Sequence, residues 1–398
     1  MARLHPVKES SGSISNKTNL CFALDITVQE LDDALSINPE SRYSQSTILK
    51  KDGSDRVVNN PHYLIRKIQR RINKRIFSNQ DVISWPDHIF GSIPNDELDD
   101  GPAAIKDYVN CCRQHCGARS VITIDIKDFF DNISRSLVLD IFEGFLSYPK
   151  DVAEILTDIC CKGGRIVQGA LTSSYIASLC LWRLEGDVVK RLGYKSLVYT
   201  RLVDDINISS KIWKYDFSYA AGLVEDMLRE ADLPINSSKT RVQYSSIDPM
   251  LVHGLRVDFP EPRLPPDEPR RIRANVKDLE LRAATPGYRA SRAYRKDFNR
   301  CLGRLNKLGR VNHQQHKPLL KRVARIKPLP SHMDIERAER LITRLERDAL
   351  KPGYMETIWF YKRFNVASQR LVILKRSFPK TAEDFRNRIN RIKPLWNE

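Results

Sequence analysis

Two apolar stretches of the chain end in carboxylates. Residues 120–125 (Ser-Val-Ile-Thr-Ile-Asp) predict a buried strand that ends at Asp125. Residues 197–209 place apolar residues before and after the adjacent acids Asp204 and Asp205, which predicts two strands joined by a tight acidic turn. A bare Asp-Asp pair is more often a solvated turn, but adjacent carboxylates repel one another and a second carboxylate lies in the same setting. Together the two stretches favour a site for a divalent cation.

Other patterns fill the rest of the first 260 residues. A capping box at residues 27–30 (Thr-Val-Gln-Glu) predicts a helix start, and residues 46–58 predict a β-hairpin that turns at Asp52-Gly53. Asn60 and Pro61 are expected to cap the next helix, with Pro61 at its first position. The remaining expected elements are helices at 103–115, 135–160 and 217–231, a loop at 85–101, a helix that follows the glycine-bearing loop 161–174 and runs through 184, a strand from about 240, and a hairpin or strand at 250–258.

The last third of the chain differs from the body in charge and pattern. Five prolines between 260 and 269 mark a boundary. Residues 263–398 contain 34 Lys and Arg against 14 Asp and Glu, a net charge of +20, whereas residues 1–262 carry −3. So uneven a distribution favours a polyanionic partner over a merely soluble basic surface. Six basic helices are expected there, at roughly 268–285, 288–308, 315–326, 333–350, 355–376 and 380–392.

The cysteines and the apolar runs bear on the cellular setting. Eight cysteines show no regular framework, and residues 1–20 lack the apolar region of a secretory signal, so a reduced cytoplasmic setting is expected. No apolar run approaches the roughly 20 residues of a membrane span, so no membrane partner is expected. Cys111, Cys112, His115 and Cys116 invite a zinc interpretation, but they lack the paired Cys-x-x-Cys spacing, and small buried thiols are favoured.

Six segments in unbroken order resemble the motifs of a bacterial reverse transcriptase, close to retron and phage-defence enzymes. Any one of them is weak evidence, whereas six in order are strong. They are Lys50-Lys-Asp-Gly53 with Arg56, Asp125-Ile-Lys-Asp-Phe-Phe130, Gln168-Gly-Ala-Leu-Thr-Ser173, Tyr199-Thr-Arg-Leu-Val-Asp-Asp205, Asn236-Ser-Ser-Lys239-Thr240 and His253-Gly-Leu255.

The resemblance implies a mixed α/β (α+β) right-hand polymerase fold with an antiparallel palm sheet. The implied parts are an N-terminal segment and helix at 1–40, fingers at 41–120, a palm with a fingers insertion at 121–260, and a basic helical thumb with a C-terminal extension at 261–398. It also implies an RNA-directed DNA polymerase that works by two-metal nucleotidyl transfer in anti-phage defence.

Three positions depart from the family pattern. Leu202 stands two residues before the first Asp of the acidic turn, where Tyr is usual, and Cys111 to His115 replaces the Asn-Ala-x-x-His of retron enzymes. Val252-His253-Gly254 replaces Val-Thr-Gly. These differences leave the carboxylates untouched. They favour a defence-associated or otherwise unclassified bacterial reverse transcriptase over a standard retron enzyme.

The resemblance assigns a role to each matched residue. Asp125, Asp204 and Asp205 are expected to be catalytic and to bind two Mg²⁺ ions, with Mn²⁺ as a substitute. The expected nucleotide-binding residues are Lys50, Arg56, Asp128, Phe129, Phe130, Gln168, Gly169 and Lys239. Phe130 falls at the sugar gate, which excludes a 2′-hydroxyl, and Phe129 is expected to be core. His253 and Gly254 are expected to support the primer end. From the residues alone, an ordinary charged hairpin is favoured for Lys50 and Arg56, and a turn lysine such as Lys239 is more often just solvated. His253 in a β turn could equally be structural.

The implied partners are an RNA template, including a structured noncoding RNA, a DNA primer or product, and deoxynucleoside triphosphates. A homo-oligomer and an effector protein remain open. Two other functions also remain open: a template-independent or protein-primed DNA polymerase, and a non-catalytic RNA-binding or splicing factor that keeps the fold. A basic structural protein would leave the six ordered matches unexplained.

Overall fold

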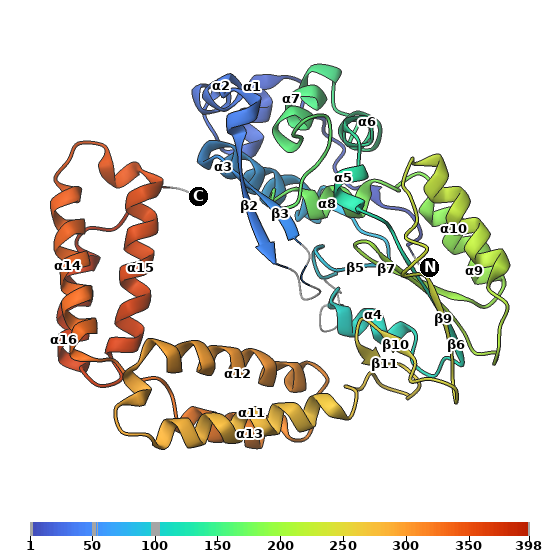
Figure 1. The fold of residues 1–398 in the computed structure, drawn as a ribbon. Helices are drawn as coiled ribbons and strands as arrows, with labels where there is room; N and C mark the ends of the chain where they lie inside the picture. The colour runs from blue at the N-terminus through green and yellow to red at the C-terminus, as the bar shows by residue number, and fades with distance from the viewer. Residues whose placement is uncertain (1–2, 50–52, 54, 97–103, 397–398) are drawn as a thin grey trace. The chain divides into compact units, whose positions relative to one another are not determined.

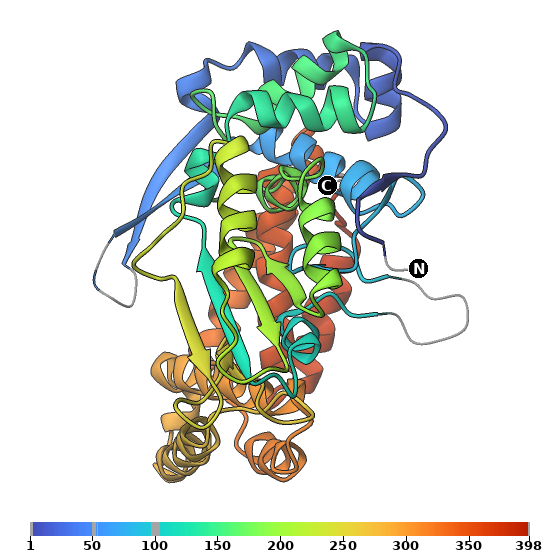
Figure 2. The same ribbon diagram turned by 90° about the vertical axis from the view of Figure 1, so that its right-hand side faces the viewer.

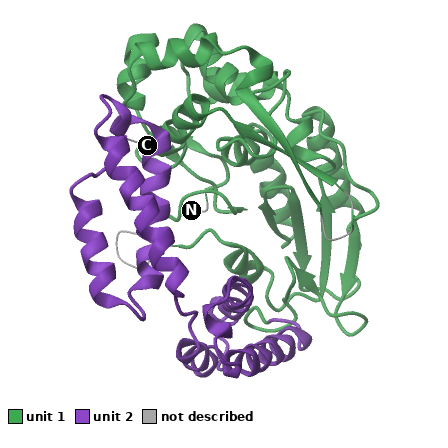
Figure 3. Ribbon diagram, turned by 60° about the vertical axis from the view of Figure 1, so that its left-hand side comes forward, with its two compact units in different colours: residues 1–263 green, residues 264–398 purple. Residues whose placement is uncertain are grey.

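The computed structural model describes residues 3–49, 53, 55–96 and 104–396, and these fall into two compact units. Unit 1 spans Met1–Arg263 and unit 2 spans Leu264–Glu398 (Figure 3). The boundary lies inside the proline-rich segment at 260–269. Among the described residues, no helix combines the length and the apolar character needed to cross a bilayer.

The N-terminal part of unit 1 is built from helices and a hairpin (Figure 1). The predicted capping box is present, because Thr27 and Glu30 exchange hydrogen bonds at the start of α2. The predicted β-hairpin is also present, as β2 and β3. The elements are β1 (Val7–Lys8), α1 (Lys17–Leu24), α2 (Val28–Ser36), the 3₁₀ turn η1 (Pro39–Arg42), β2 (Tyr43–Leu49), β3 (Asp55–Pro61), α3 (Tyr63–Ile72), the π-helical turn η2 (Asn73–Phe77) and β4 (Ile83–Ser84).

The expected cap at Asn60 and Pro61 is wrong. Both residues belong to β3, where Pro61 pairs with Tyr43 at the end of the ladder, and α3 begins only at Tyr63 after His62. A proline lacks an N–H and fits the end of a two-stranded ladder as well as the first turn of a helix. The pairing of Pro61 with Tyr43 places the proline at the end of the ladder and not in the first turn of the helix.

A five-stranded sheet forms the centre of unit 1, with strand order β5-β7-β8-β6-β9 (Figure 2). All neighbours are antiparallel except β5 and β7, which run parallel. The strands are β5 (Ile89–Phe90), β6 (Ser120–Asp125), β7 (Val198–Leu202), β8 (Asp205–Ser210) and β9 (Arg241–Tyr244). The predicted acidic hairpin is therefore β7–β8, and the predicted strand at 120–125 lies beside it as β6. The edge strand β5 was expected to be loop.

Helices pack around this sheet, and α9 and α10 cover one of its faces (Figure 2). Three expected helices are shorter than predicted. The helix expected at 103–115 begins at Tyr108, where Asp107 caps it, the one at 135–160 is interrupted before Pro149, and the one ending at 184 stops at Leu179. The elements are α4 (Tyr108–Gln114), α5 (Phe129–Asn132), α6 (Arg135–Asp140), the π-helical turn η3 (Ile141–Phe145), α7 (Lys150–Cys160), α8 (Ser173–Leu179), α9 (Glu185–Tyr194), α10 (Ser218–Glu230) and the hairpin β10 (Leu251–Val252) with β11 (Leu255–Arg256).

Unit 2 is helical, and all six predicted basic helices are present. They form two three-helix groups, each with its own apolar core (Figure 1). The elements are α11 (Asp267–Ala284), the 3₁₀ turn η4 (Tyr288–Ala290), α12 (Arg292–Arg310), α13 (His316–Arg325), α14 (His332–Ala349), the 3₁₀ turn η5 (Tyr354–Glu356), α15 (Ile358–Leu374) and α16 (Pro379–Asn390).

Candidate active site

The central sheet has one apolar face and one polar face. Along β8, Ile206 and Ile208 are fully buried in the main core of unit 1, whereas Asp205, Asn207 and Ser209 point the other way because side chains alternate along a strand. The polar face therefore extends from the acidic turn to the far end of the strand, below α4 and the β10–β11 hairpin.

The strand register brings Asp125 to the acidic turn. Asp125 at the end of β6 lies directly opposite Asp205 at the start of β8. Directly paired residues of an antiparallel ladder have Cβ atoms about 4.5–5.5 Å apart on the same face. The carboxylates of Asp125 and Asp205 are thus neighbours on the polar face, and Asp204 precedes them in the turn.

Asp125 is the most enclosed of the three carboxylates, with 6% exposure. The Asn236 side-chain amide donates to its Oδ2 at 2.9 Å, and the ammonium of Lys239 lies 3.0 and 3.2 Å from its two oxygens. The hydrogen bond to Asp125 raises the pKa of Lys239. The segment after α10 therefore folds back over the end of β6 and compensates the charge of Asp125.

The turn between β7 and β8 has only two residues, Val203 and Asp204. Val203 has a φ of 60°, a conformation that β-branched residues rarely adopt. The backbone N–H of Ile126 donates to the Asp204 carbonyl at 3.1 Å, which ties the turn to the end of β6. Burial, the Asp205 carboxylate and, less strongly, Asp125 raise the pKa of Asp204. The carboxylates at the turn therefore repel one another, and a bound cation would reduce that repulsion.

A buried ion pair supports the turn from the apolar side. Arg201 is fully buried and makes a bidentate pair with Glu185, with contacts of 2.6 and 2.7 Å. The same guanidinium donates to the carbonyl of Val203 at 3.1 Å. The Tyr199 hydroxyl also donates to Glu185, at 2.7 Å. These residues went unrecognised in the sequence, although a lone Arg in an apolar strand signals a buried partner.

The opposite, polar side of the hairpin is held by histidines and thiols. His115 is 1% exposed, and its two ring nitrogens lie 2.7 Å from the hydroxyls of Ser209 and Thr200. Burial lowers the pKa of His115 to about 3, so the ring is neutral at neutral pH. The Cys111 thiol donates to the Thr200 hydroxyl at 3.2 Å. Helix α4 is therefore fastened to β7 and β8 by hydrogen bonds between side chains.

The same contacts bear on the zinc interpretation of this cysteine group. Burial raises the pKa of Cys111 to about 12 and that of Cys116 to about 11, and it raises the pKa of Cys112 further. A zinc ligand must be a thiolate. Each of these thiols instead donates a hydrogen bond, Cys112 to the carbonyl of Val252 at 3.0 Å.

His253 and Gly254 form the turn of the β10–β11 hairpin, and both have positive φ, 46° and 77°. His253 Nδ1 lies 3.5 Å from an oxygen of Asp205, and its Nε2 lies 3.3 Å from the amide nitrogen of Asn207. The predicted primer-side residue is therefore in contact with the acidic turn. Gly254 is at the exposed tip beside it.

The Gln168–Gly169 loop contacts the predicted fingers hairpin. The backbone N–H of Asn59 in β3 donates to the Gln168 carbonyl at 2.7 Å. Gly169 has a φ of 105°, and a Cβ there would clash with the Asn59 carbonyl oxygen, so this approach requires glycine. Arg56 is exposed on β3 and pairs with Ile48 in the ladder. Lys50 lies outside the described residues.

The segment after β6 carries the remaining predicted residues. Asp128 has a φ of 45° and precedes α5. Phe129 is 2% exposed and belongs to the core, as expected, whereas Phe130 is half-buried beside it, with ring centroids 6.1 Å apart. Phe130 is thus the ring of the two that is accessible to a ligand.

An open cavity of about 420 Å³ lies against the carboxylates, lined by Thr123, Asp125, Asp205, Ser238, Lys239 and Arg241. Among the described residues, no three Asp, Glu, His or Cys side chains already stand in the arrangement of a metal site. The donors nevertheless suit a hard divalent ion, because they are carboxylates whose mutual repulsion already raises the pKa of Asp204. Lys239 now holds the cationic position at Asp125, so a metal would have to displace its ammonium.

The chain is similar to known proteins along most of its length. The reverse transcriptase (RNA-dependent DNA polymerase) family matches residues 48–259. The retron Ec48 reverse transcriptase of Escherichia coli is 45% identical over 399 residues, which cover 99% of this chain and 97% of that protein. The retron Se72 reverse transcriptase of Salmonella heidelberg (strain 579083-10) is 30% identical over 283 residues, 70% of this chain and 71% of that protein.

A solved structure of apo telomerase from Candida tropicalis aligns with a TM-score of 0.41 at 11% identity, covering 88% of this chain and 69% of that one. At that score the likeness supports no conclusion about function.

The relatives correct one inference from the sequence. Leu202, the segment Cys111 to His115, and Val252-His253-Gly254 favoured an enzyme outside the standard retron group. The similarity along nearly the whole chain is to a retron reverse transcriptase, so these positions do not separate the chain from retron enzymes. Together, the matched family, the full-length relative and the paired carboxylates on the central sheet show that the chain belongs to the reverse transcriptase family, as an RNA-directed DNA polymerase of the retron type.

Proposed function

We propose that this reverse transcriptase makes DNA by two-metal nucleotidyl transfer at Asp125, Asp204 and Asp205. The primer 3′-hydroxyl oxygen attacks the α-phosphorus of a deoxynucleoside triphosphate, and the bond to pyrophosphate breaks. Two bound Mg²⁺ ions, or Mn²⁺ in their place, would lower the pKa of that hydroxyl and stabilise the charge of the displacement. The observation that carries the proposal is the direct pairing of Asp125 with Asp205 beside Asp204 on the polar face.

The neighbouring residues would bind the substrates. Arg56 and Lys50 would neutralise the triphosphate, and the backbone near Asp128 and Phe129 would reach it. Gln168 and Gly169 would line the incoming base and the template. Phe130 would exclude a 2′-hydroxyl, which its half-buried position beside Phe129 allows.

Two further residues would act on the reacting ends. Lys239 is 64% exposed at its side chain and lies 3.0 Å from Asp125. It could therefore turn toward pyrophosphate and donate a proton. His253 and Gly254 would support the primer end through the contact between His253 and Asp205.

We further propose that the template is a structured noncoding RNA and that DNA synthesis serves anti-phage defence. Similarity to retron reverse transcriptases and the net charge of +20 in residues 263–398 support an RNA partner.

Mg²⁺-dependent incorporation by the protein purified with its co-expressed RNA tests the proposal. Asp204→Ala/Asp205→Ala should abolish deoxynucleotide incorporation. Glu225→Ala/Asp226→Ala removes an equal charge from adjacent exposed acids of α10 and should retain it. Sequencing the product separates templated from template-independent or protein-primed synthesis. Tight RNA binding without incorporation by the unmodified protein would support the non-catalytic RNA-binding protein instead.

A further inference from the structure

The two halves of unit 2 repeat one another in sequence. Shifting residues 264–329 by 66 positions aligns them with 330–395 without a gap, and 20 of the 66 aligned positions are identical. Pro-Gly-Tyr recurs at 286–288 and 352–354, and Arg-Ile-Lys-Pro-Leu recurs at 325–329 and 391–395. We name residues 264–329 the first module and residues 330–395 the second module.

The two modules also repeat one another in structure. Each has a long helix, a 3₁₀ turn, a second long helix and a shorter third helix. The glycines of the two Pro-Gly-Tyr turns have φ values of 71° and 70°. The backbone N–H of Leu329 donates to Arg289 at 2.9 Å, and that of Leu395 donates to Met355 at 3.0 Å, 66 residues further on. Unit 2 is therefore a tandem repeat of one three-helix module.

Paired ion contacts occupy equivalent places in both modules. Glu280 and Arg322 make a bidentate pair with contacts of 2.8 and 2.6 Å, and Glu346 and Arg388 make one with contacts of 2.8 and 2.7 Å. These shared residues and the shared core positions have a role in folding.

Four exposed cations are also identical in the two modules. They have no ion pair with a carboxylate in residues 264–396, all of which the structure describes. The pairs are Lys296 and Lys362, Arg304 and Arg370, Arg325 and Arg391, and Lys327 and Lys393. In the second module Lys362 lies 5.2 Å from the centroid of the Trp359 ring and Arg370 donates to the Arg337 carbonyl at 3.2 Å, but the first module has Ala293 in place of Trp359, so the ring contact does not explain the shared lysine. Exposed positions outside ion pairs are free to differ between copies, as Lys317 and Glu383 or Lys321 and Asn387 do. Identity at these four pairs therefore points to a shared ligand.

The four cations lie on two adjoining parts of each module. In the first module, Lys296 and Arg304 are eight residues apart on α12, a little over two turns, and lie away from its buried residues. Arg325 and Lys327 lie where the chain returns from α13 toward the start of α12, because the Lys327 carbonyl accepts from the Arg289 guanidinium at 2.7 Å. The set thus follows one edge of the module.

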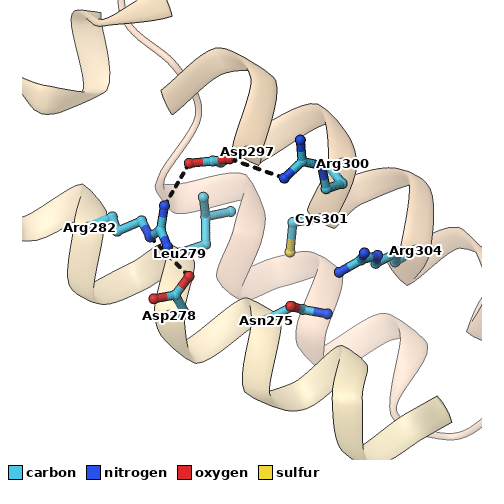
Figure 4. A pocket seen from close by; sticks show the side chains of 8 residues that line it. All are labelled: Asn275, Asp278, Leu279, Arg282, Asp297, Arg300, Cys301 and Arg304. Carbon is cyan, nitrogen blue, oxygen red and sulfur yellow. Dashed lines mark hydrogen bonds and ion pairs between the residues drawn. The ribbon is translucent and has the colours of Figure 1, made fainter. Parts of the chain in front are cut away.

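The groove between α11 and α12 shows how Arg304 differs from its neighbours. Arg282 and Arg300 both contact Asp297, whereas Arg304 lines the same cavity of about 170 Å³ without a carboxylate partner (Figure 4). An unpaired guanidinium beside a shallow groove is suited to a phosphate.

We propose that the second module is a second phosphate-contacting module, equivalent to the first, so that unit 2 holds the nucleic-acid backbone at two repeated surfaces. The proposal rests on the proposed function in that the polyanion is RNA or its DNA copy. Two equivalent modules on one chain would raise affinity by acting together, because the second contact is intramolecular once the first has formed.

The salt dependence of RNA binding by the full chain tests this proposal. Fluorescence anisotropy with a labelled mixed-sequence RNA hairpin gives the slope of log K against log salt. Replacing Lys362, Arg370, Arg391 and Lys393 by Gln should reduce the magnitude of that slope by about 3, since each phosphate contact contributes about 0.7–0.9. The equivalent set in the first module, Lys296, Arg304, Arg325 and Lys327, should reduce it by the same amount.

A matched control removes four exposed cations of the second module whose counterparts are uncharged. Arg340, Arg347, Lys375 and Lys380 align with Ala274, Leu281, Gly309 and Gln314. Their replacement by Gln should change the slope by less than about 1, as expected of general charge alone. Thermal unfolding of all three variants should match the unmodified protein within a few degrees, since substitutions at exposed surface positions change stability little.

Equal slopes for the repeated set and its control would overturn the proposal, as would an unchanged slope for the repeated set in the second module. DNA synthesis at saturating RNA, measured in parallel, keeps this outcome separate from the proposed function. An enzyme that synthesises DNA while the slopes are equal contradicts only the second contact surface. An unmodified protein that binds RNA without synthesis contradicts only the polymerase.

Discussion

Units 1 and 2 position their functional residues in opposite ways. In unit 1, Asp125 is fixed by Asn236 and Lys239, more than 100 residues away in the chain, and by the register of β6 against β8. In unit 2 the exposed cations are carried by helices whose structure is set locally and then repeated after 66 residues. The active site therefore depends on a few exact contacts, whereas the basic unit spreads its contribution over many similar ones.

The largest predicted contrast is between two arginine–glutamate pairs. Arg201→Met removes one partner of a fully buried pair in unit 1 and should lower the free energy of unfolding by about 3–5 kcal/mol. Arg322→Met breaks the partly exposed pair with Glu280 in unit 2 and should cost at most about 1 kcal/mol. Urea unfolding of both variants measures this. If both variants lost the same free energy of unfolding, the buried pair of unit 1 would be no more important for stability than the exposed pair of unit 2.

The buried histidine of unit 1 predicts a pH effect. His115 has its pKa lowered to about 3 by burial, from an ordinary value near 6.5. The unfolded chain therefore takes up a proton first as the pH falls below about 6.5, and the folded state loses about 2 kcal/mol of stability between pH 7 and pH 5 from this group. Urea unfolding at pH 7 and at pH 5 measures this loss of stability, which should be about 2 kcal/mol smaller in His115→Gln than in the unmodified protein. In the exposed-site control His332→Gln in unit 2, the loss of stability should equal that of the unmodified protein.

The smallest predicted effect concerns a single ring in unit 1. Phe130→Val should raise incorporation of ribonucleotides relative to deoxynucleotides by about tenfold, since steric discrimination in a pocket is worth about 1–3 kcal/mol. Competition between the two nucleotides in one primer-extension reaction measures the ratio. The same substitution at the buried neighbour Phe129 should destabilise the protein instead, and an unchanged ratio in Phe130→Val would remove Phe130 from the sugar gate.

Local patterns in the sequence predicted local structure well. The capping box at 27–30, the β-hairpin, the acidic β7–β8 turn and the six helices of unit 2 all follow from residues close together in the chain. The family match confirms the reverse transcriptase assignment that the ordered motifs suggested. The subdomain boundaries and the roles of individual site residues stay predictions.

Features that depend on distant contacts could not be predicted in this way. Strand β5 has only two residues and joins the sheet through β7, more than 100 residues later. Pro61 lies in a strand because Tyr43 pairs with it. From the sequence alone Arg201 would be taken for an exposed cation, because its buried partner Glu185 comes from a different element. The 66-residue repeat has 20 identities spread over 66 positions, so it is fainter in the sequence than the local patterns, whereas the matching order of helices makes it plain in the structure.

The central claim is that the carboxylates on the polar face of the sheet form a divalent-metal site. The most direct measurement is Mn²⁺ binding, followed by electron paramagnetic resonance, to the unmodified protein, Asp125→Asn and the exposed-acid control Asp226→Asn. The account predicts that Asp125→Asn weakens Mn²⁺ binding at least about tenfold, because one buried carboxylate ligand is lost, and that Asp226→Asn leaves it unchanged. Identical Mn²⁺ binding by all three proteins would contradict the account.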